Sequence, residues 1–303
     1  MLTVTLVATF AAAAMWQQWR SIEVETAERA RVQSAWILVG ALDWSRLILA
    51  EDANAGPVDH LAEPWAIPLE EARLSTFLAA ERNVAQVPDA STDTSDAFLS
   101  GQIIDLQSRL NLANLAHPGA VQEEVLEQFN RLFARLGLPP SELTALAQGL
   151  AMAQDTDDSS ANVPLMPQTL DQLAWLGVSP ATLAALAPHA TLLPERGTRL
   201  NINTASAEAL MASIEGLDTA GANKLLAVRQ LQHFRTLADA RTLLGTGVLL
   251  LDSVHDVKSS YFEVRGRLRL GDVTVHERSL VRRVGRSVST LWRERGATVL
   301  ASP

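Results

Sequence analysis

The first 19 residues contain no charged side chain, and this run constrains the fold more than any other feature of the chain. As a helix, MLTVTLVATFAAAAMWQQW is long enough to cross the ~30 Å hydrocarbon core of a bilayer. Trp16 and Trp19 stand at its end beside Arg20, where amphipathic rings and a cation suit the membrane interface. The run predicts one membrane span at residues 1–19. A cleaved secretory signal is the weaker alternative, because nothing basic precedes the run and the helical pattern continues beyond it.

The helical pattern extends well past this run. Between Met1 and Gly56 there is no proline and one glycine, Gly40. Residues 20–50 alternate charged side chains with an apolar stripe, which predicts an amphipathic helix. Joined to the first run it would be ~50 residues and ~75 Å long, too long to be buried in one small domain. We expect its first half to lie in lipid or against other subunits and its second half to pack on the next domain. Two helices with a bend near Arg20 are the alternative.

The next 50 residues read as loops followed by a strand. Residues 51–100 carry Gly56-Pro57 and three further prolines, and residues 89–96 are polar. Residues 99–106 alternate between apolar and polar side chains, which predicts a strand.

Between residues 121 and 251 apolar side chains recur at helical spacing in several short segments. Start and stop signals flank these segments: Gly137 after the first, the capping-box spacing T-x-x-Q from Thr169, Gly177, and Ser179 before a proline. This region predicts a compact helical unit of ~130 residues, a normal domain size.

The C-terminal region returns to strand periodicity. Tyr261–Leu270 alternates apolar residues with Arg265, Arg267 and Arg269, and Gly271-Asp272 fits a two-residue hairpin. More strands are expected through residues 281 and 290–292. For the arginine row we favour a solvated strand face over a specific anion site. The order helix, strand, helical insert, strands predicts an α+β fold. Its domains are a stem at 1–19, a first body segment at 20–116, an inserted helical domain at 117–254 and strands at 255–303.

Composition and motifs exclude several classes of function. The chain has 25 basic and 34 acidic residues, a net charge of −9, and an acidic body of this kind disfavours nonspecific binding to nucleic acid or anionic lipid. With no cysteine there is no disulfide, thiolate nucleophile or Cys-ligated metal. The chain contains no G-x-S-x-G, P-loop, G-x-G-x-x-G or H-E-x-x-H motif, and its six histidines are scattered. We therefore expect no enzymatic activity.

One acidic cluster could bind a metal. The carboxylates of Asp155, Asp157 and Asp158 lie in a polar loop and are hard oxygen ligands of the kind that calcium prefers. The spacing is not that of an EF-hand, because Ser159 stands at the third ligand position, no glycine follows, and Met166 replaces the final glutamate. On the residues alone, a solvated loop is the favoured interpretation.

Residues 199–251 look like a helix-hairpin-helix element, with a tight turn at Gly216-Leu217-Asp218. DNA-binding members of that superfamily present backbone amides and basic residues to phosphate. Here the hairpin carries Glu215 and Asp218, so we expect little affinity for phosphate and no nucleic-acid partner.

Taken together, the chain resembles the type II secretion system protein K family, the large minor pseudopilins. The resemblance covers almost the whole chain and rests on the order and spacing of several segments. They are the uncharged stem, DHLAEPWA (59–66), GQIIDLQSRLNLANL (101–115), INTASAEAL (202–210) and YFEVRGRLRLGD (261–272) followed by SLVRR (279–283).

The resemblance implies a pilin-like fold, with a long N-terminal helix packed on a small antiparallel sheet and a large all-α domain inserted in the sheet region. It also implies a single-pass protein of the inner membrane with its C-terminal domain in the periplasm. Its implied partners are two smaller minor pseudopilins in a tip complex, the pseudopilus shaft and the inner-membrane secretion platform. The implied role is to support export of folded proteins across the outer membrane.

Two departures from the family pattern matter. Members begin with a short basic leader and a glycine, cut by the prepilin peptidase, whereas here Met1 opens the apolar run. We expect a start codon assigned too late, with a lost leader as the alternative, and no cleavage site can be named. The second departure concerns calcium: Asp155 and Asp157 match the first acidic segment of the family's calcium loop, but the second segment is missing between Ser159 and Pro167. Calcium is the one cofactor that the resemblance implies.

Two other functions compete with this interpretation. A membrane-tethered DNA receptor of the competence type also places a helix-hairpin-helix after one membrane span, but it predicts a basic hairpin and no C-terminal strands. A hydrolase is the third class, and the empty motif scan disfavours it.

Overall fold

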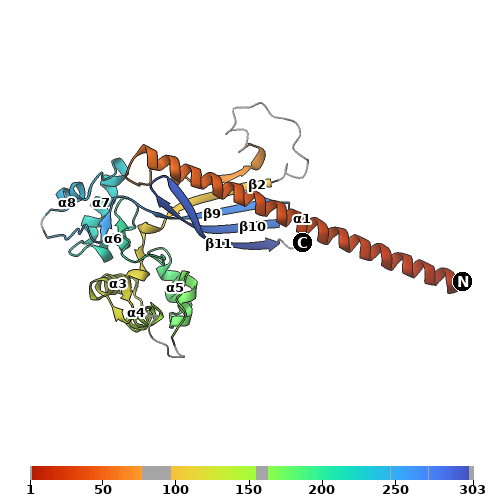
Figure 1. Cartoon of the computed structure of the whole chain (residues 1–303), viewed down its shortest axis with the longest axis horizontal. Helices are drawn as coiled ribbons and strands as arrows, with labels where there is room; N and C mark the ends of the chain where they lie inside the picture. The colour runs from red at the N-terminus through yellow and green to blue at the C-terminus, as the bar shows by residue number, and fades with distance from the viewer. Residues whose placement is uncertain (1, 77–96, 155–162, 246, 272, 300–303) are drawn as a thin grey trace.

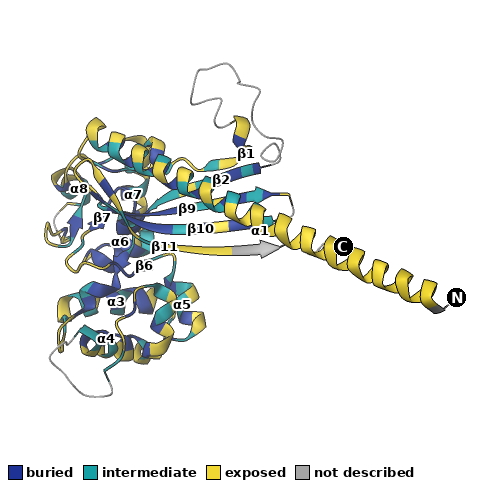
Figure 2. Cartoon of the chain, turned by 45° about the vertical axis from the view of Figure 1, so that its right-hand side comes forward, coloured by how far each residue is buried: buried dark blue, intermediate teal, exposed yellow. Residues whose placement is uncertain are grey.

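A computed structural model describes residues 2–76, 97–154, 163–245, 247–271 and 273–299. Its most prominent element is helix α1 (Leu2–Ala55), a single unbroken helix of 54 residues that projects far beyond the rest of the molecule (Figure 1). Residues 3–29 are exposed, and the remainder lies along a sheet (Figure 2). The predicted long helix is confirmed, and the alternative of two helices bent near Arg20 is wrong.

The buried face of α1 follows from its sequence. Buried residues recur every three or four positions, so they form one stripe along the helix. These residues are Ser34, Leu38, Leu42, Ser45, Leu49 and Asp52. Leu38 packs with Leu99, Leu268 and Val275, and Leu42 and Leu49 pack with Phe262 and Val281. The stripe fixes the C-terminal half of α1 to the sheet, while the N-terminal half has no such surface to cover.

The sheet has five strands in the order β1-β2-β9-β10-β11, and each neighbouring pair is antiparallel. The strands are β1 (Leu69–Arg73), β2 (Ala97–Asp105), β9 (Tyr261–Leu270), β10 (Val273–Val284) and β11 (Ser287–Val299). Because β2 pairs directly with β9, the 155 residues that separate them in the chain form an insert in the sheet. This confirms the α+β class, with a long helix on a small antiparallel sheet and a helical domain inserted in it.

Several local predictions for the sheet are confirmed. The strand expected at 99–106 is β2. Leu270 pairs with Val273 and Gly271 has a φ of +57°, while Asp272 of the predicted turn lies outside the described residues. Strands β10 and β11 are longer than predicted. Strand β1 is missing from the predictions, because its sequence LEEAR lacks the alternation that marks a strand.

The inserted helical unit, residues 106–256, has its own apolar core. Its helices are α3 (Glu123–Leu136), α4 (Pro140–Gln154), α5 (Pro180–Leu186), α6 (Ala207–Ser213), α7 (Thr219–Leu231) and α8 (Leu237–Leu244). The described part of the unit also contains the short 3₁₀ helices η3 (Leu106–Ser108), η4 (Leu112–Leu115) and η5 (Leu170–Leu176), and a further one, η1 (Pro64–Ala66), lies in the loop after α1. Paired short strands complete the unit: β3 (Leu110–Asn111) with β6 (Ala190–Thr191), β4 (Ala116–His117) with β5 (Ala120–Val121), and β7 (Leu200–Asn201) with β8 (His255–Asp256).

The predicted helix signals act as expected in this unit. Gly137 and Gly177 end their helices with φ values of +67° and +89°, a conformation that glycine adopts without strain. Gln172 accepts a hydrogen bond from the backbone of Thr169, as the capping-box spacing requires. Ser179 accepts a hydrogen bond from the backbone N–H of Thr182 at the start of α5.

The predicted membrane span at residues 1–19 falls short in hydropathy. Within the described residues, the structure contains no helix whose length and apolar character would carry it across a membrane. Three threonines, two glutamines and two tryptophans lower the mean hydropathy of the uncharged run.

Candidate functional site

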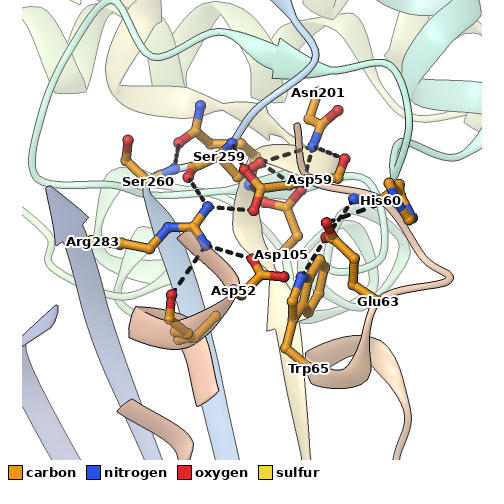
Figure 3. Close-up of polar contacts among 12 residues, drawn as sticks. Asp52, Asp59, His60, Glu63, Trp65, Asp105, Asn201, Ser259, Ser260 and Arg283 are labelled. Atoms are coloured by element: carbon orange, nitrogen blue, oxygen red, sulfur yellow. Dashed lines mark hydrogen bonds and ion pairs between the residues drawn. The ribbon is translucent and has the colours of Figure 1, made fainter. Parts of the chain in front are cut away.

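A cluster of buried polar side chains lies where α1 ends and where the sheet meets the helical unit (Figure 3). We call this cluster the junction. It consists of Asp52, Asp59, Asp105, Asn201, Ser259 and Arg283, all buried. Asp52 comes from α1, Asp59 from the loop after it, Asp105 from the end of β2, Asn201 from β7 and Arg283 from β10. Segments far apart in the chain are therefore joined at one point.

Arg283 is the cation of the junction. Its guanidinium forms an ion pair with Asp52, at 2.8 Å, and another with Asp59. It also donates to the backbone oxygens of Leu49 and Ser259, at 3.3 and 3.0 Å. A buried charge is tolerated when it is paired and hydrogen-bonded, and each terminal nitrogen of Arg283 has one carboxylate and one backbone oxygen as acceptors. The side chain thus ties β10 to the end of α1 and to the loop that follows.

Burial dominates the electrostatics of Asp59. Removal from water raises the pKa of this carboxyl from 3.8 to about 6, although Arg283 and a backbone N–H from Ser259 act in the opposite direction. The charge of one guanidinium is shared between two carboxylates, so it does not offset the full cost of burying both.

Asp105 joins the sheet to the helical unit. One of its oxygens accepts hydrogen bonds from Asn201, Thr204 and Ser259, at 3.2, 2.5 and 2.7 Å. The other accepts the backbone N–H of Gln107 at 2.7 Å. Burial raises the pKa of Asp105, and these four donors oppose that rise. Because two of the donors lie at positions 201 and 204, this one carboxyl holds the helical unit against the end of β2.

Glu63 lies beside the junction in the loop after α1. Its Oε2 accepts the indole N–H of Trp65 at 2.7 Å and the backbone N–H of His60 at 2.9 Å. Burial raises its pKa from 4.5 to about 7, and the neighbouring carboxyls of Asp52 and Asp59 add to the rise. The ring of His60 stacks on the ring of His233, which belongs to the helical unit.

The carboxyl oxygens of Asp52, Asp59 and Glu63 lie within 4.8 Å of one another. Arg283 pairs with the first two, and Trp65 and His60 donate to the third. The protein's own donors therefore satisfy these groups. The contacts of these carboxyls therefore link α1, the loop that follows it and β10.

The predicted calcium residues Asp155, Asp157 and Asp158 lie outside the residues that the structure describes, so their prediction stays a prediction. In the arginine row on β9, Arg265 pairs with Glu263, and Arg269 pairs with Glu71 and stacks over Phe98.

The hairpin predicted at 199–251 is present, with α6, a turn at Gly216 and α7. Its acidic residues explain why it is unsuited to phosphate. Asp218 caps the start of α7 by accepting the N–H of Gly221 at 2.7 Å. In a phosphate-binding hairpin the helix N-terminus would face the ligand, and here a carboxylate of the chain takes that place.

Sequence reasoning missed the junction, although a signal was present. Asp59 and Glu63 lie in the segment 59–66, Asp105 in 101–115, Thr204 in 202–210 and Arg283 in 279–283. These are the segments that carry the family resemblance, and the structure brings them together at one buried site.

Comparisons with known proteins agree on one family. Models of the type II secretion system (T2SS) protein K family match residues 108–195 and 200–258. The type II secretion system protein K of Pseudomonas aeruginosa is 26% identical over 82% of this chain and 76% of its own length. The protein of the same name from Aeromonas hydrophila is 30% identical over 61% of this chain and 66% of its own length.

The fold also matches a solved structure. It resembles a chain in the crystal structure of the GspK-GspI-GspJ complex from the enterotoxigenic Escherichia coli type 2 secretion system. The TM-score is 0.66 with 18% identity, and the match covers 89% of this chain and 98% of that one. At this level of identity the match establishes the fold.

Proposed function

The chain belongs to the type II secretion system protein K family and is a minor pseudopilin of that system, and we propose that it joins two smaller minor pseudopilins to form the tip of the periplasmic pseudopilus. The similar solved chain comes from a complex of three such proteins, which supports this proposal. In this role the chain would help to export folded proteins across the outer membrane. The work is structural, and the junction supplies rigidity in place of catalysis.

The outward face of α1 carries the proposal. Val32, Trp36 and Leu47 are exposed, with 71% of the Trp36 side-chain surface in solvent. At ~100° per residue Trp36 and Leu47 lie on the opposite side of α1 from the buried Leu38, and Val32 lies next to Trp36 on the helix surface. We call Val32, Trp36 and Leu47 the outward stripe, in which the exposed Asp43 also lies between Trp36 and Leu47. Exposed apolar side chains without a partner inside the chain suit contact with a helix from another subunit.

The start of α1 supports the finer localisation that we propose, an inner-membrane protein with one anchor and a periplasmic C-terminal domain. Residues 2–19 carry no charge, and Trp16 and Trp19 lie together beside Arg20 with ring centroids 5.5 Å apart. Paired tryptophans next to a cation suit the boundary between lipid and water.

Replacing Trp36 with alanine tests the outward stripe. We expect W36A to recover at least about tenfold less of the two smaller pseudopilins than wild type, because an exposed tryptophan at a helix contact commonly dominates binding. The measurement is co-purification from detergent-solubilised inner membranes, followed by quantification of both partners. Trp36 has no buried role in the monomer, so the variant should remain folded.

Trp175 provides the matched control, since it is also a half-exposed tryptophan but lies in the helical unit. W175A should recover both partners as wild type does. If wild type itself is absent from the membrane fraction or captures no pilin-like partner, the proposed function is wrong. If W36A binds as well as wild type, the function stands and the outward stripe is not the contact.

We also propose that Asp155, Asp157 and Asp158 bind calcium, and this part of the proposal is tested separately. Titration calorimetry on the full chain in detergent should show binding at about 1 mM calcium, the range of weak extracellular sites. The double variant Asp155→Asn, Asp157→Asn should lose that heat, whereas Glu123→Gln, Glu124→Gln in α3 should keep it. Absence of binding by wild type removes calcium from the proposal.

A further inference from the structure

The loop that follows α1 touches the helical unit through two imidazole rings. His60 in this loop and His233 between α7 and α8 stack with centroids 3.8 Å apart and planes tilted by 13°. The two residues are 173 positions apart in the chain, so the stack is a contact between the helical unit and the helix-and-sheet body. Two protonated rings at this distance would repel each other.

Glu63 lies beside this stack, and its surroundings favour a neutral carboxyl. The side chain is largely buried, at 14% exposure. Its Oε2 accepts N–H donors from Trp65 and the backbone of His60, which lower the pKa of Glu63, but burial and the nearby carboxyls of Asp52 and Asp59 raise it further. Its Oε1 lies 3.7 Å from Nε2 of His60. Among the described residues, His60 is the one basic side chain within ion-pair range of Glu63.

The charged groups around Glu63 come from every element that meets here. Asp52 faces it from α1 and Asp59 from its own loop, and Asp105 from β2 acts in turn on Asp59. Arg283 from β10 is already engaged by Asp52 and Asp59. The surroundings therefore hold more negative than positive charge, which makes a further negative charge on Glu63 costly.

His60 does not compensate by gaining a proton. Burial lowers its pKa below the ordinary 6.5, and the charge of His233 lowers it further. Its Nδ1 also accepts the backbone N–H of Ala62 at 3.3 Å, a contact that a neutral ring can make. As the pH falls towards neutrality, the proton therefore goes to the carboxyl rather than to the imidazole.

We propose that Glu63 is the proton-binding group of a latch between the body and the helical unit, and that the latch tightens when this carboxyl is protonated and loosens when it ionises. The loop 59–66, the His60–His233 stack and the junction form one contact surface. Their charge balance therefore sets how tightly the two parts hold together.

The direction of the pH dependence follows from the sign of the shift. Glu63 has a pKa of about 7 in the folded protein and 4.5 when released, so the stabilisation is fully present below about pH 4.5 and is lost as the pH rises through about 7. Asp59, shifted from 3.8 to about 6, adds a smaller loss at lower pH.

Hydrogen exchange tests the latch in the full chain purified in detergent. After correction for intrinsic rates, the opening equilibrium constant of amides 57–66 should rise about twentyfold in wild type between about pH 6 and about pH 8. In Glu63→Gln the rise should shrink to about twofold, the share of Asp59, because glutamine keeps the acceptor oxygen and does not titrate. Glu23→Gln, an exposed site on α1, should behave as wild type.

A second measurement uses the wild-type chain and avoids any question of folding. In an NMR titration the His60 ring should gain its proton below the ordinary pKa of a histidine, and His233→Asn should move that value upwards. An equal pH dependence in wild type and Glu63→Gln overturns the proposal, and so does a His60 ring that is protonated before Glu63.

Discussion

Replacing Arg283 with alanine should destabilise the chain by about 3–5 kcal/mol, the cost of leaving a buried ion pair without one partner. Asp52 and Asp59 would lose their shared cation while remaining buried, and the backbone oxygens of Leu49 and Ser259 would lose a donor. In thermal unfolding this corresponds to a decrease in Tm on the order of 10 °C. The difference in unfolding free energy between wild type and Arg283→Ala should become smaller below about pH 6, where Asp59 is protonated in the folded protein.

Two further variants separate charge from geometry. Arg283→Lys keeps the charge but loses the planar guanidinium that contacts both carboxylates. Its unfolding free energy should therefore lie between those of wild type and Arg283→Ala. Arg267→Ala, at an exposed position on the same sheet, should change the unfolding free energy by no more than about 0.5 kcal/mol. Equal losses for Arg283→Ala and Arg267→Ala would show that Arg283 does not hold the junction together.

Replacing Asp105 with alanine should have the second-largest effect, a loss of at least about 3 kcal/mol. Three side-chain donors and one backbone N–H would lose their acceptor in a buried site, and each unsatisfied group costs about 1–3 kcal/mol. Two of the three side-chain donors, Asn201 and Thr204, belong to the helical unit, so this part should separate from the sheet first. Urea unfolding gives the total loss, and limited proteolysis near residues 199–206 reports the separation.

Asparagine at position 105 tests the mechanism. It keeps an acceptor oxygen for one side of the cluster but places an N–H₂ group against a donor on the other, so the loss should be intermediate. Asp171→Ala removes a carboxylate that is 79% exposed and should be nearly neutral. If Asp105→Ala lowers the unfolding free energy but leaves the rate of proteolysis at residues 199–206 unchanged, Asp105 does not dock the helical unit.

The local structure could be read from the sequence where one short pattern decides it. The absence of proline up to Gly56 predicted α1, and alternation predicted β2 and β9. Glycine and serine signals predicted the ends of several helices because cap geometry depends on a few adjacent residues. Strand β1 could not be read in this way, since LEEAR becomes a strand through pairing with β2.

The junction could not be predicted because its partners are distant in sequence. Asp59 and Arg283 are 224 positions apart, and a spacing rule cannot connect them. The sequence did show the family resemblance, but the contacts that the resembling segments make are visible only in the folded structure. Asp105 and Arg283 are the clearest examples, since each lies in such a segment and each binds elements from other parts of the chain.

The unbroken course of α1 has a mechanical consequence. The helix has no kink, its last turns are bonded to Arg283, and Arg283 reaches the loop that contacts the helical unit. A force applied to the exposed end of α1 would therefore be transmitted through the helix to the contacts at its other end. Axial force and displacement at the N-terminal end of α1 would in this way be transmitted to the helical unit.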